Sequence, residues 1–175
     1  VKRLNENQDI DFIYSDEDKI STRGNRMDPH FKPDWSPDTL YSCNYIAHFS
    51  VIRKSTVDGL GGFREGYDGS QDYDLFLRVV ERTQRSAHIS RVLYHWRMIP
   101  HSAASSSNAK PYAHIAAERA IIDSLERRKV EGEVLDGPSP GFYRVKYKIL
   151  GNPKVSIIIL IKDEVKNLQK CIQSI

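Results

Sequence analysis

The stretch Asp9-Ile10-Asp11-Phe12-Ile13-Tyr14-Ser15-Asp16-Glu17-Asp18-Lys19 decides how this chain folds. Residues 9–15 have the length and apolar content of a β-strand that is buried on at least one side. Three carboxylates follow in succession at the carboxyl end of that strand, where open α/β sheets place their ligands. Residues 16–35 contain a glycine and two prolines without sustained periodicity, so we expect them to form a long loop.

Two interpretations of Asp16, Glu17 and Asp18 stay open. Adjacent like charges repel, and a divalent cation or a cationic partner would relieve that repulsion; carboxylate oxygens suit Mg²⁺ or Mn²⁺. Alternatively, the three residues form a solvated acidic turn in which Lys19 offsets some of the charge. The segment lacks the glycine and the later glutamate of an EF-hand loop, which excludes calcium binding of that kind.

A second segment, Gly66-Tyr67-Asp68-Gly69-Ser70-Gln71-Asp72-Tyr73-Asp74, predicts the start of a helix capped by Ser70. Apolar residues then recur at i, i+3, i+4 and i+7, namely Tyr73, Phe76, Leu77 and Val80. Asp72 and Asp74 fall in the first turn, where the helix dipole favours an ionised carboxylate that could act as a base. An aspartate in a first turn is also a common helix-start device, and that role needs no catalysis.

A third segment, Tyr94-His95-Trp96-Arg97 followed by His101, combines side chains suited to a phosphorylated sugar. The fork of Arg97 suits phosphate, the flat face of Trp96 suits a sugar ring, and His101 could serve as a base or a metal ligand. Each could equally be a packed strand residue, since tryptophan lies more often in a core than on a binding platform.

The rest of the chain predicts an α/β protein with a boundary near residue 152. We expect helices over residues 37–44, 55–60 and 111–129, and strands over residues 45–53, 87–97 and 142–150. Val155 to Ile161 is a β-branched run typical of a parallel strand with both faces buried. A helix marked by Val165, Leu168 and Ile172 follows it, and this order of elements is how a doubly wound α/β domain begins.

Composition narrows the functional classes. The chain has 175 residues, 39% of them hydrophobic, and a net charge of +3 from dispersed Lys and Arg, which argues against a nucleic-acid partner. This weak basicity would favour a polyanionic substrate or an anionic membrane surface without choosing between them. No apolar run reaches the roughly 20 residues of a membrane span, and the first residues do not form a signal peptide. The two cysteines have no zinc-site spacing, so a reducing cytoplasm is expected.

Several of these segments together resemble the carboxyl-terminal half of bacterial family 2 glycosyltransferases, especially tandem rhamnosyl- or other polysaccharide transferases. The matching residues are 13–20, 29–38, 44–46, 61–64, 69–75 and 93–97. Residues 154–175 resemble the opening strand and helix of a second such domain. The resemblance implies a partial GT-A fold, doubly wound and truncated at its amino-terminal half, with residues 1–151 in one domain and residues 152–175 in the next.

The resemblance also implies a function. Family members are inverting enzymes that transfer a sugar from a nucleotide-sugar donor to a glycan or other hydroxyl acceptor, with a divalent metal ion, Mg or Mn, on the diphosphate. Asp72 maps onto the catalytic base. Substrate contacts are expected from Asp16, Glu17, Asp18, Asp74, Trp96 and Arg97, and a metal contact from His101. The main metal motif, Asp-x-Asp, is expected upstream of residue 1, so the chain is predicted to be inactive alone. The remainder of a longer parent is the expected partner, with peripheral association at the inner face of the membrane.

Other hypotheses remain. The chain could be a non-catalytic carbohydrate-binding or scaffolding domain, whereas the motifs that flank the carboxylates do not suit a metal-dependent hydrolase or nuclease. We also expect residues 155–161 to pack beside the strands of the first domain, in place of the opening strand that it lacks.

Overall fold

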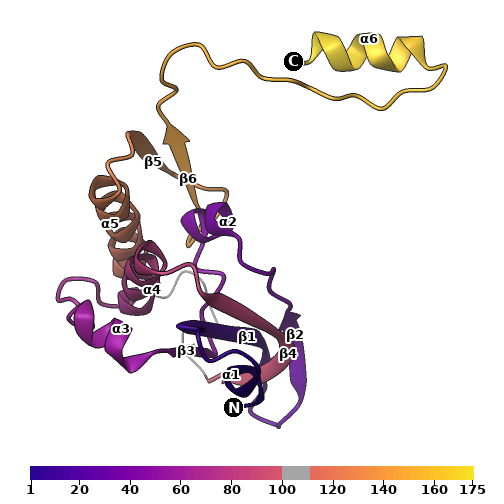
Figure 1. Ribbon diagram of the computed structural model, residues 1–175. Coiled ribbons are helices and arrows are strands. Elements are labelled where there is room, and N and C mark those ends of the chain that lie inside the picture. The colour runs from indigo at the N-terminus through magenta and orange to yellow at the C-terminus, as the bar shows by residue number, and fades with distance from the viewer. Residues whose placement is uncertain (100–110) are drawn as a thin grey trace.

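A computed structural model describes residues 1–99 and 111–175 and shows a mixed α/β protein (Figure 1). Its elements follow one another along the chain as α1 (Lys2–Glu6), β1 (Phe12–Ile20), β2 (Arg26–His30), α2 (Pro37–Ser42), β3 (Ser50–Ile52), α3 (Lys54–Gly59), α4 (Gln71–Arg82), β4 (Ser86–Arg97), α5 (Pro111–Arg127), β5 (Gly132–Asp136), β6 (Tyr143–Tyr147) and α6 (Val165–Gln173). None of the helices in the described ranges is long and apolar enough to cross a membrane.

Strand β1 is the centre of the larger sheet. Strand β4 runs parallel to it along its whole length, from Phe12 opposite Ser86 to Ile20 opposite Arg97. Strands β2 and β3 are both antiparallel to β1 and pair with different parts of it, β3 with residues 12–14 and β2 with residues 17–20. Because β4 occupies one edge of β1, the two short strands must share the other edge. Every side chain from Phe12 to Asp18 is consequently buried.

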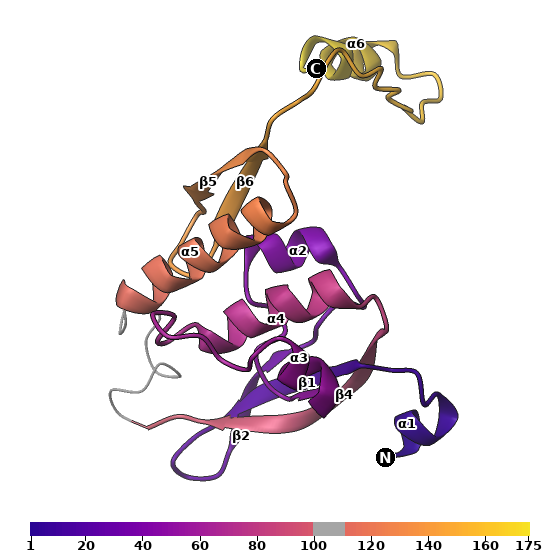
Figure 2. The same ribbon diagram turned by 60° about the vertical axis from the view of Figure 1, so that its left-hand side comes forward.

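Helices α4 and α5 stack in layers over the larger sheet, as Figure 2 shows. The predicted apolar stripe of α4 is confirmed, because Tyr73, Phe76 and Leu77 are buried in the main core. Phe76 meets Phe12 of β1 with ring centroids 5.4 Å apart. Helix α5 adds small and branched residues to the same core, including Ala120 and Ile121. Burying each large apolar side chain stabilises the fold by about 1.5–3 kcal/mol.

A two-stranded antiparallel hairpin, β5 and β6, lies against α5 and α2. The predicted strand over residues 142–150 is present as the shorter β6, whereas β5 was not expected. The loop from Gly137 to Gly141 turns β5 back into β6, and the amide of Gly137 donates to the carbonyl of Phe142 (2.9 Å).

Two expectations about the first third of the chain are wrong. The first strand does not end at residue 15 but continues to Ile20, so Asp16, Glu17 and Asp18 belong to it. The region 16–35 is therefore not one long loop, since it also contains β2. The strand expected over residues 45–53 is reduced to Ser50–Ile52, because residues 44–48 form a turn instead.

The prediction for Val155 to Ile161 is also wrong. These residues are not in a strand and leave the body of the protein together with α6 (Figures 1 and 2). Leu160 is 97% exposed and Ile158 is 89% exposed. The run does not pack beside the larger sheet, which consists of β1, β2, β3 and β4. The larger sheet therefore mixes antiparallel and parallel pairs, and an α/β class is confirmed without a doubly wound arrangement.

A buried ion-pair network anchors α4. Asp74 is fully buried, and its carboxylate accepts hydrogen bonds from Arg78 (Nε to Oδ2, 2.9 Å) and from Arg64 (Nε, 3.2 Å to each oxygen). Arg78 continues to the carbonyls of Leu60 (2.9 Å) and Gly62 (2.7 Å). One carboxylate thus fixes the loop before α4 to the helix itself.

Replacing Asp74 by Asn should lower the free energy of unfolding by about 3–5 kcal/mol, because it removes one side of a buried charge pair without changing its volume. Urea denaturation of the full chain measures the effect. Asp68→Asn is the matched control, since Asp68 is exposed and its substitution should change stability by less than about 0.5 kcal/mol. Equal midpoints for the two variants would contradict this role.

Candidate functional site

The acidic stretch of β1 is buried and is paired with cationic or histidine side chains. Asp16 accepts hydrogen bonds through Oδ1 from the backbone amide of Lys32 (2.9 Å) and meets Nε2 of His88 (2.8 Å). The His88 ring stacks on Tyr14, with centroids 4.9 Å apart, and its Nδ1 lies 3.2 Å from Asp34. Asp16 therefore holds the segment after β2 against β4.

Glu17 lies at the centre of the cluster. Its Oε2 accepts hydrogen bonds from Lys32 Nζ (3.1 Å) and from the backbone amide of His48 (2.9 Å), and it lies 3.2 Å from His48 Nδ1. Burial by itself raises the pKa of Glu17, but the hydrogen bond from His48 and the charge of Lys32 outweigh it. The pKa of Glu17 is therefore below its usual value, and the carboxylate is ionised at neutral pH.

Asp18 completes the series. Its Oδ2 accepts from Arg26 Nε (2.6 Å), and its Oδ1 is hydrogen-bonded to His95 Nδ1. These pairings show that the repulsion among the carboxylates is relieved by protein cations and histidines rather than by water, so the solvated-turn interpretation is wrong. Lys19, the residue expected to offset the charge, pairs instead with Asp28 (3.3 Å).

These residues do not fit a metal ion. Within residues 1–99 and 111–175, no three His, Cys, Asp or Glu side chains are arranged so that they could hold one. Each β1 carboxylate faces its own partners instead of a shared point. The divalent cation implied by the resemblance has no site among the described residues.

Lys32 is the cation that the sequence did not single out. Its side chain is completely buried, and Nζ donates to Glu17 and to the carbonyls of Ile46 and His48. Burial lowers the pKa of Lys32, and the charge of Glu17 opposes that change. The only available signal was its place in the segment His30-Phe31-Lys32-Pro33, which the resemblance had included without a role for the lysine.

The turn at residues 44–48 links this cluster to Asp72. Asn44 Oδ1 accepts from the amide of Ala47 (3.3 Å), while Asn44 Nδ2 donates to Asp72 Oδ2 (3.1 Å). At the other end of the turn, the carbonyl of His48 accepts from Lys32. The predicted base and the acidic strand therefore contact opposite ends of the same short turn.

Asp72 and Asp74 have different surroundings. Asp72 is half-buried in the first turn of α4, and within the described ranges Asn44 is its hydrogen-bonding partner. Asp74 is enclosed with both oxygens held by arginines, so this geometry gives no support to its predicted substrate contact. Ser70 occupies the N-cap position, but its hydroxyl donates to the carbonyl of Ala113 (2.7 Å) instead of capping α4.

Trp96 and Arg97 end β4, beside Lys19 and Ile20 of β1. Trp96 is half-buried, and its ring lies 5.0 Å from that of His48. Arg97 is exposed. His101, the predicted metal contact, lies outside the described residues.

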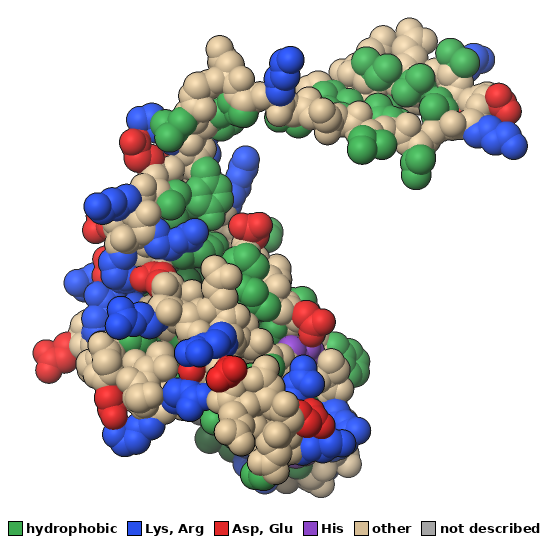
Figure 3. Space-filling view, in the orientation of Figure 1, with side chains coloured by type: hydrophobic (Ala, Val, Ile, Leu, Met, Phe, Trp, Pro, Cys, Tyr) green, Lys and Arg blue, Asp and Glu red, His purple; other side chains and the backbone are tan. Residues whose placement is uncertain are grey.

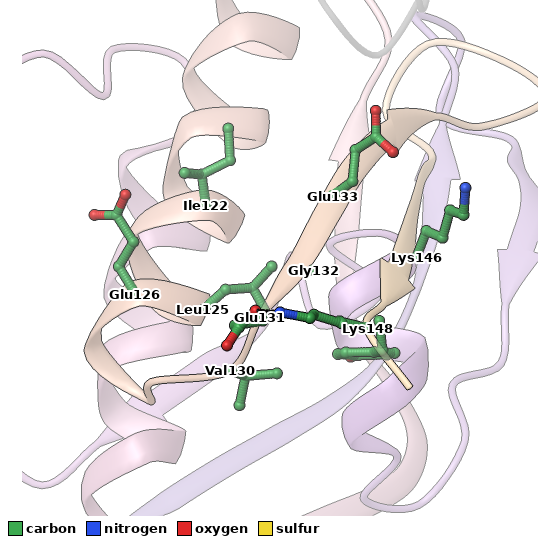
Figure 4. A pocket seen from close by; sticks show the side chains of 10 residues that line it. Ile122, Leu125, Glu126, Val130, Glu131, Gly132, Glu133, Lys146 and Lys148 are labelled. Carbon is green, nitrogen blue, oxygen red and sulfur yellow. Dashed lines mark hydrogen bonds and ion pairs between the residues drawn. The ribbon is translucent and has the colours of Figure 1, made fainter. Parts of the chain in front are cut away.

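A separate hollow of about 560 Å³ lies between the end of α5 and the β5–β6 hairpin (Figure 4). Its lining combines apolar side chains such as Ile122 and Leu125 with charged ones, and Glu131 and Lys148, which both line it, form an ion pair. None of the predicted site residues that the structure describes lines this hollow. On the face shown in Figure 3, positive and negative side chains intermingle over the body of the molecule.

The free energy of unfolding should fall as the pH drops through about 4, where Asp and Glu carboxyls of the unfolded chain titrate. The pKa values of Glu17 and Asp11 are lowered in the folded state, because hydrogen bonds to ionised groups outweigh burial, so the unfolded chain binds more protons. The stabilisation is complete above that range and is lost below it. Urea denaturation at a series of pH values should show a shallower acid slope for Glu17→Gln than for the wild type, and an unchanged slope for the exposed control Glu133→Gln. Identical slopes for both variants would refute the assignment.

Comparison with known proteins gives two long relatives. No family model matches the chain. It is 46% identical over 178 aligned residues to the uncharacterized protein y4gI of Sinorhizobium fredii, a match that covers all of this chain and 20% of that protein. It is 42% identical over 167 residues to the O-antigen biosynthesis protein RfbC of Myxococcus xanthus, which covers 95% of this chain and 13% of that protein. The chain thus spans a fifth or less of the curated relatives it matches, and it is homologous to one segment of each.

Proposed function

We propose that this chain takes part in cell-surface polysaccharide synthesis as the acceptor-side portion of an inverting glycosyltransferase. The observation that carries the proposal is its 42% identity, over nearly its whole length, to a protein named for O-antigen biosynthesis. Since the match covers 13% of that relative, the donor-binding portion is proposed to lie elsewhere in a longer protein.

Asp72 is the proposed catalytic base. One carboxylate oxygen is fixed by Asn44, whereas Oδ1 has no hydrogen-bond partner among the described residues. A base needs such an open oxygen in order to accept a proton. As the acceptor hydroxyl oxygen bonds to the anomeric carbon, its proton passes to Asp72 and the nucleoside diphosphate leaves from the opposite face of the sugar. No step of this proposal passes through a metal ion, because the described residues do not fit one.

A carbohydrate-binding domain without catalysis is the second candidate. It is favoured by one observation, the half-buried aromatic group of His48, Tyr94 and Trp96 at the edge of the acidic cluster. Aromatic faces suit sugar rings whether or not a transfer follows. The two functions differ in their dependence on Asp72.

Asp72→Asn should reduce sugar transfer by about 100-fold to 10,000-fold, because the amide cannot accept the acceptor proton at neutral pH. The complete gene product that carries residues 1–175 is assayed with nucleotide-sugars and a lipid-linked glycan acceptor. The substitution should leave the urea midpoint nearly unchanged, since Asp72 is half-buried and, among the described residues, its side chain is hydrogen-bonded to Asn44 alone.

Asp68→Asn serves as the matched control, because Asp68 is exposed and lies just before the same helix. Its activity should equal that of the wild type. Undiminished transfer by Asp72→Asn would refute the role of base and favour the binding-domain alternative.

Residues 1–175 alone should bind nucleotide-sugars more weakly than micromolar, since no group among the described residues is arranged to hold the diphosphate-bound metal. Isothermal titration with UDP-sugars and dTDP-sugars in the presence of Mn²⁺ measures this affinity. Micromolar binding would show that the chain already contains a donor site and would overturn the proposed division of roles.

A further inference from the structure

His48 differs from the other described histidines in having an aromatic stack and an open ring nitrogen together. His88 has partners on both nitrogens, Asp16 and Asp34. His114 contacts Asp136 through Nε2, and its Nδ1 accepts from the amide of Gly141 (3.2 Å). His48 meets Glu17 through Nδ1, and within the described ranges its Nε2 has no hydrogen-bond partner.

Glu17 determines the tautomer of His48. An ionised carboxylate accepts hydrogen bonds and cannot donate one, so Nδ1 must carry the proton that faces Oε2. In the neutral ring, Nε2 then presents a lone pair. The His48 side chain is 34% exposed, so part of its ring reaches solvent.

The ring of His48 is held in place by aromatic neighbours. It stacks on Tyr94 with centroids 4.7 Å apart and planes inclined by 12°, and it lies 5.0 Å from Trp96 at an inclination of 50°. Tyr94 and Trp96 are two positions apart on β4, so their side chains lie on the same face of that strand. We call His48, Tyr94 and Trp96 the aromatic shelf.

The backbone of His48 is fixed separately from its ring. Its carbonyl accepts from the buried Lys32 ammonium, and its amide donates to Glu17 (2.9 Å). A change of the His48 side chain therefore leaves the anchoring of the turn in place. The role of the ring can therefore be tested by substitution without loss of the backbone hydrogen bonds of His48.

We propose that His48 is a ligand-binding residue whose Nε2 accepts a hydrogen bond from a sugar hydroxyl while the ring of that sugar lies on the aromatic shelf. The face of an aromatic ring next to a fixed hydrogen-bond acceptor complements a pyranose, which has an apolar face and hydroxyl groups at its rim. His48 and Asn44 are four positions apart in the chain, so their Cα atoms lie within roughly 14 Å of each other. The aromatic shelf is therefore close to the residue that holds Asp72. An acceptor glycan of more than one ring would therefore span both. The proposal rests on the proposed function only for the identification of the ligand as a sugar.

The first measurement concerns the tautomer and involves no sugar. In the ¹⁵N-labelled full chain, the ring shifts of the neutral form of His48, identified in a pH series, should show a protonated Nδ1 and an unprotonated Nε2. Glu17→Gln should weaken this preference, because an amide can donate as well as accept. A His48 ring with the proton on Nε2 would overturn the proposal.

The second measurement concerns binding. A panel of methyl hexosides and methyl 6-deoxyhexosides is titrated into the same chain, and the ring signals of His48 and Trp96 are followed. We expect shifts at both residues, with affinity in about the millimolar range. His48→Phe keeps the stack and removes the acceptor nitrogen, so it should weaken binding about tenfold, the effect of one lost hydrogen bond.

His114→Phe is the matched control, because His114 also stacks on a tyrosine, Tyr143 at 4.8 Å, but lies on α5. It should bind glycosides like the wild type. Wild-type affinity for His48→Phe, or shifts confined to the hollow beside α5, would overturn the inference, as would the absence of shifts with every glycoside.

The outcomes for Asp72 and His48 are independent. If Asp72→Asn retains transfer while His48→Phe loses glycoside binding, the proposed base is wrong and the sugar shelf stands. If Asp72→Asn loses transfer while His48→Phe binds normally, the transferase stands and the shelf is refuted.

Discussion

The pairing of Glu17 with Lys32 is the interaction on which the rest of the structure depends. Both charges are buried, and removing an ion from water costs several kcal/mol unless another charge and further hydrogen bonds satisfy it. Lys32 meets this requirement by directing its three donors at Glu17 and at two carbonyls of the turn at residues 44–48. The pair that makes a charged central strand tolerable thus also fixes the turn that reaches Asp72.

Two other buried carboxylates, those of Asp11 and Asp74, are likewise satisfied by arginine side chains. Asp11, just before β1, accepts from Arg53 (2.7 Å), Arg85 (2.8 Å) and Thr83 (2.7 Å), which ties β3 and the start of β4 to the central strand. Asp74 holds Arg78, which in turn binds the carbonyl of Gly62 in the loop before α4. Each carboxylate joins segments that are distant in sequence, and a change in strand register would leave it unpaired. Such hubs select one arrangement more than they add stability.

Local patterns predicted some elements well and others poorly. The stripe of Tyr73, Phe76 and Leu77 identified α4, because periodicity reports burial on one face of a helix directly. The burial of the acidic residues of β1 has no local signal, since it depends on Lys32, Arg26 and three histidines that come from other segments. The link between Asp72 and Asn44 depends likewise on a turn whose shape no local pattern reveals. Val155 to Ile161 has the composition of a buried strand but has no neighbour to pair with in the described chain.

That exposed run has a consequence for the behaviour of the protein in solution. Residues 155–161 contain no charge and no proline, are rich in β-branched side chains, and have the length of segments that form steric zippers. Their backbone is free to add to a strand of any molecule that presents one. Lys162 and Asp163, which follow at once, act as charged gatekeepers against fibril growth. Among the described residues, this exposed run therefore has the composition best suited to pairing between molecules, whereas the packed core determines folding.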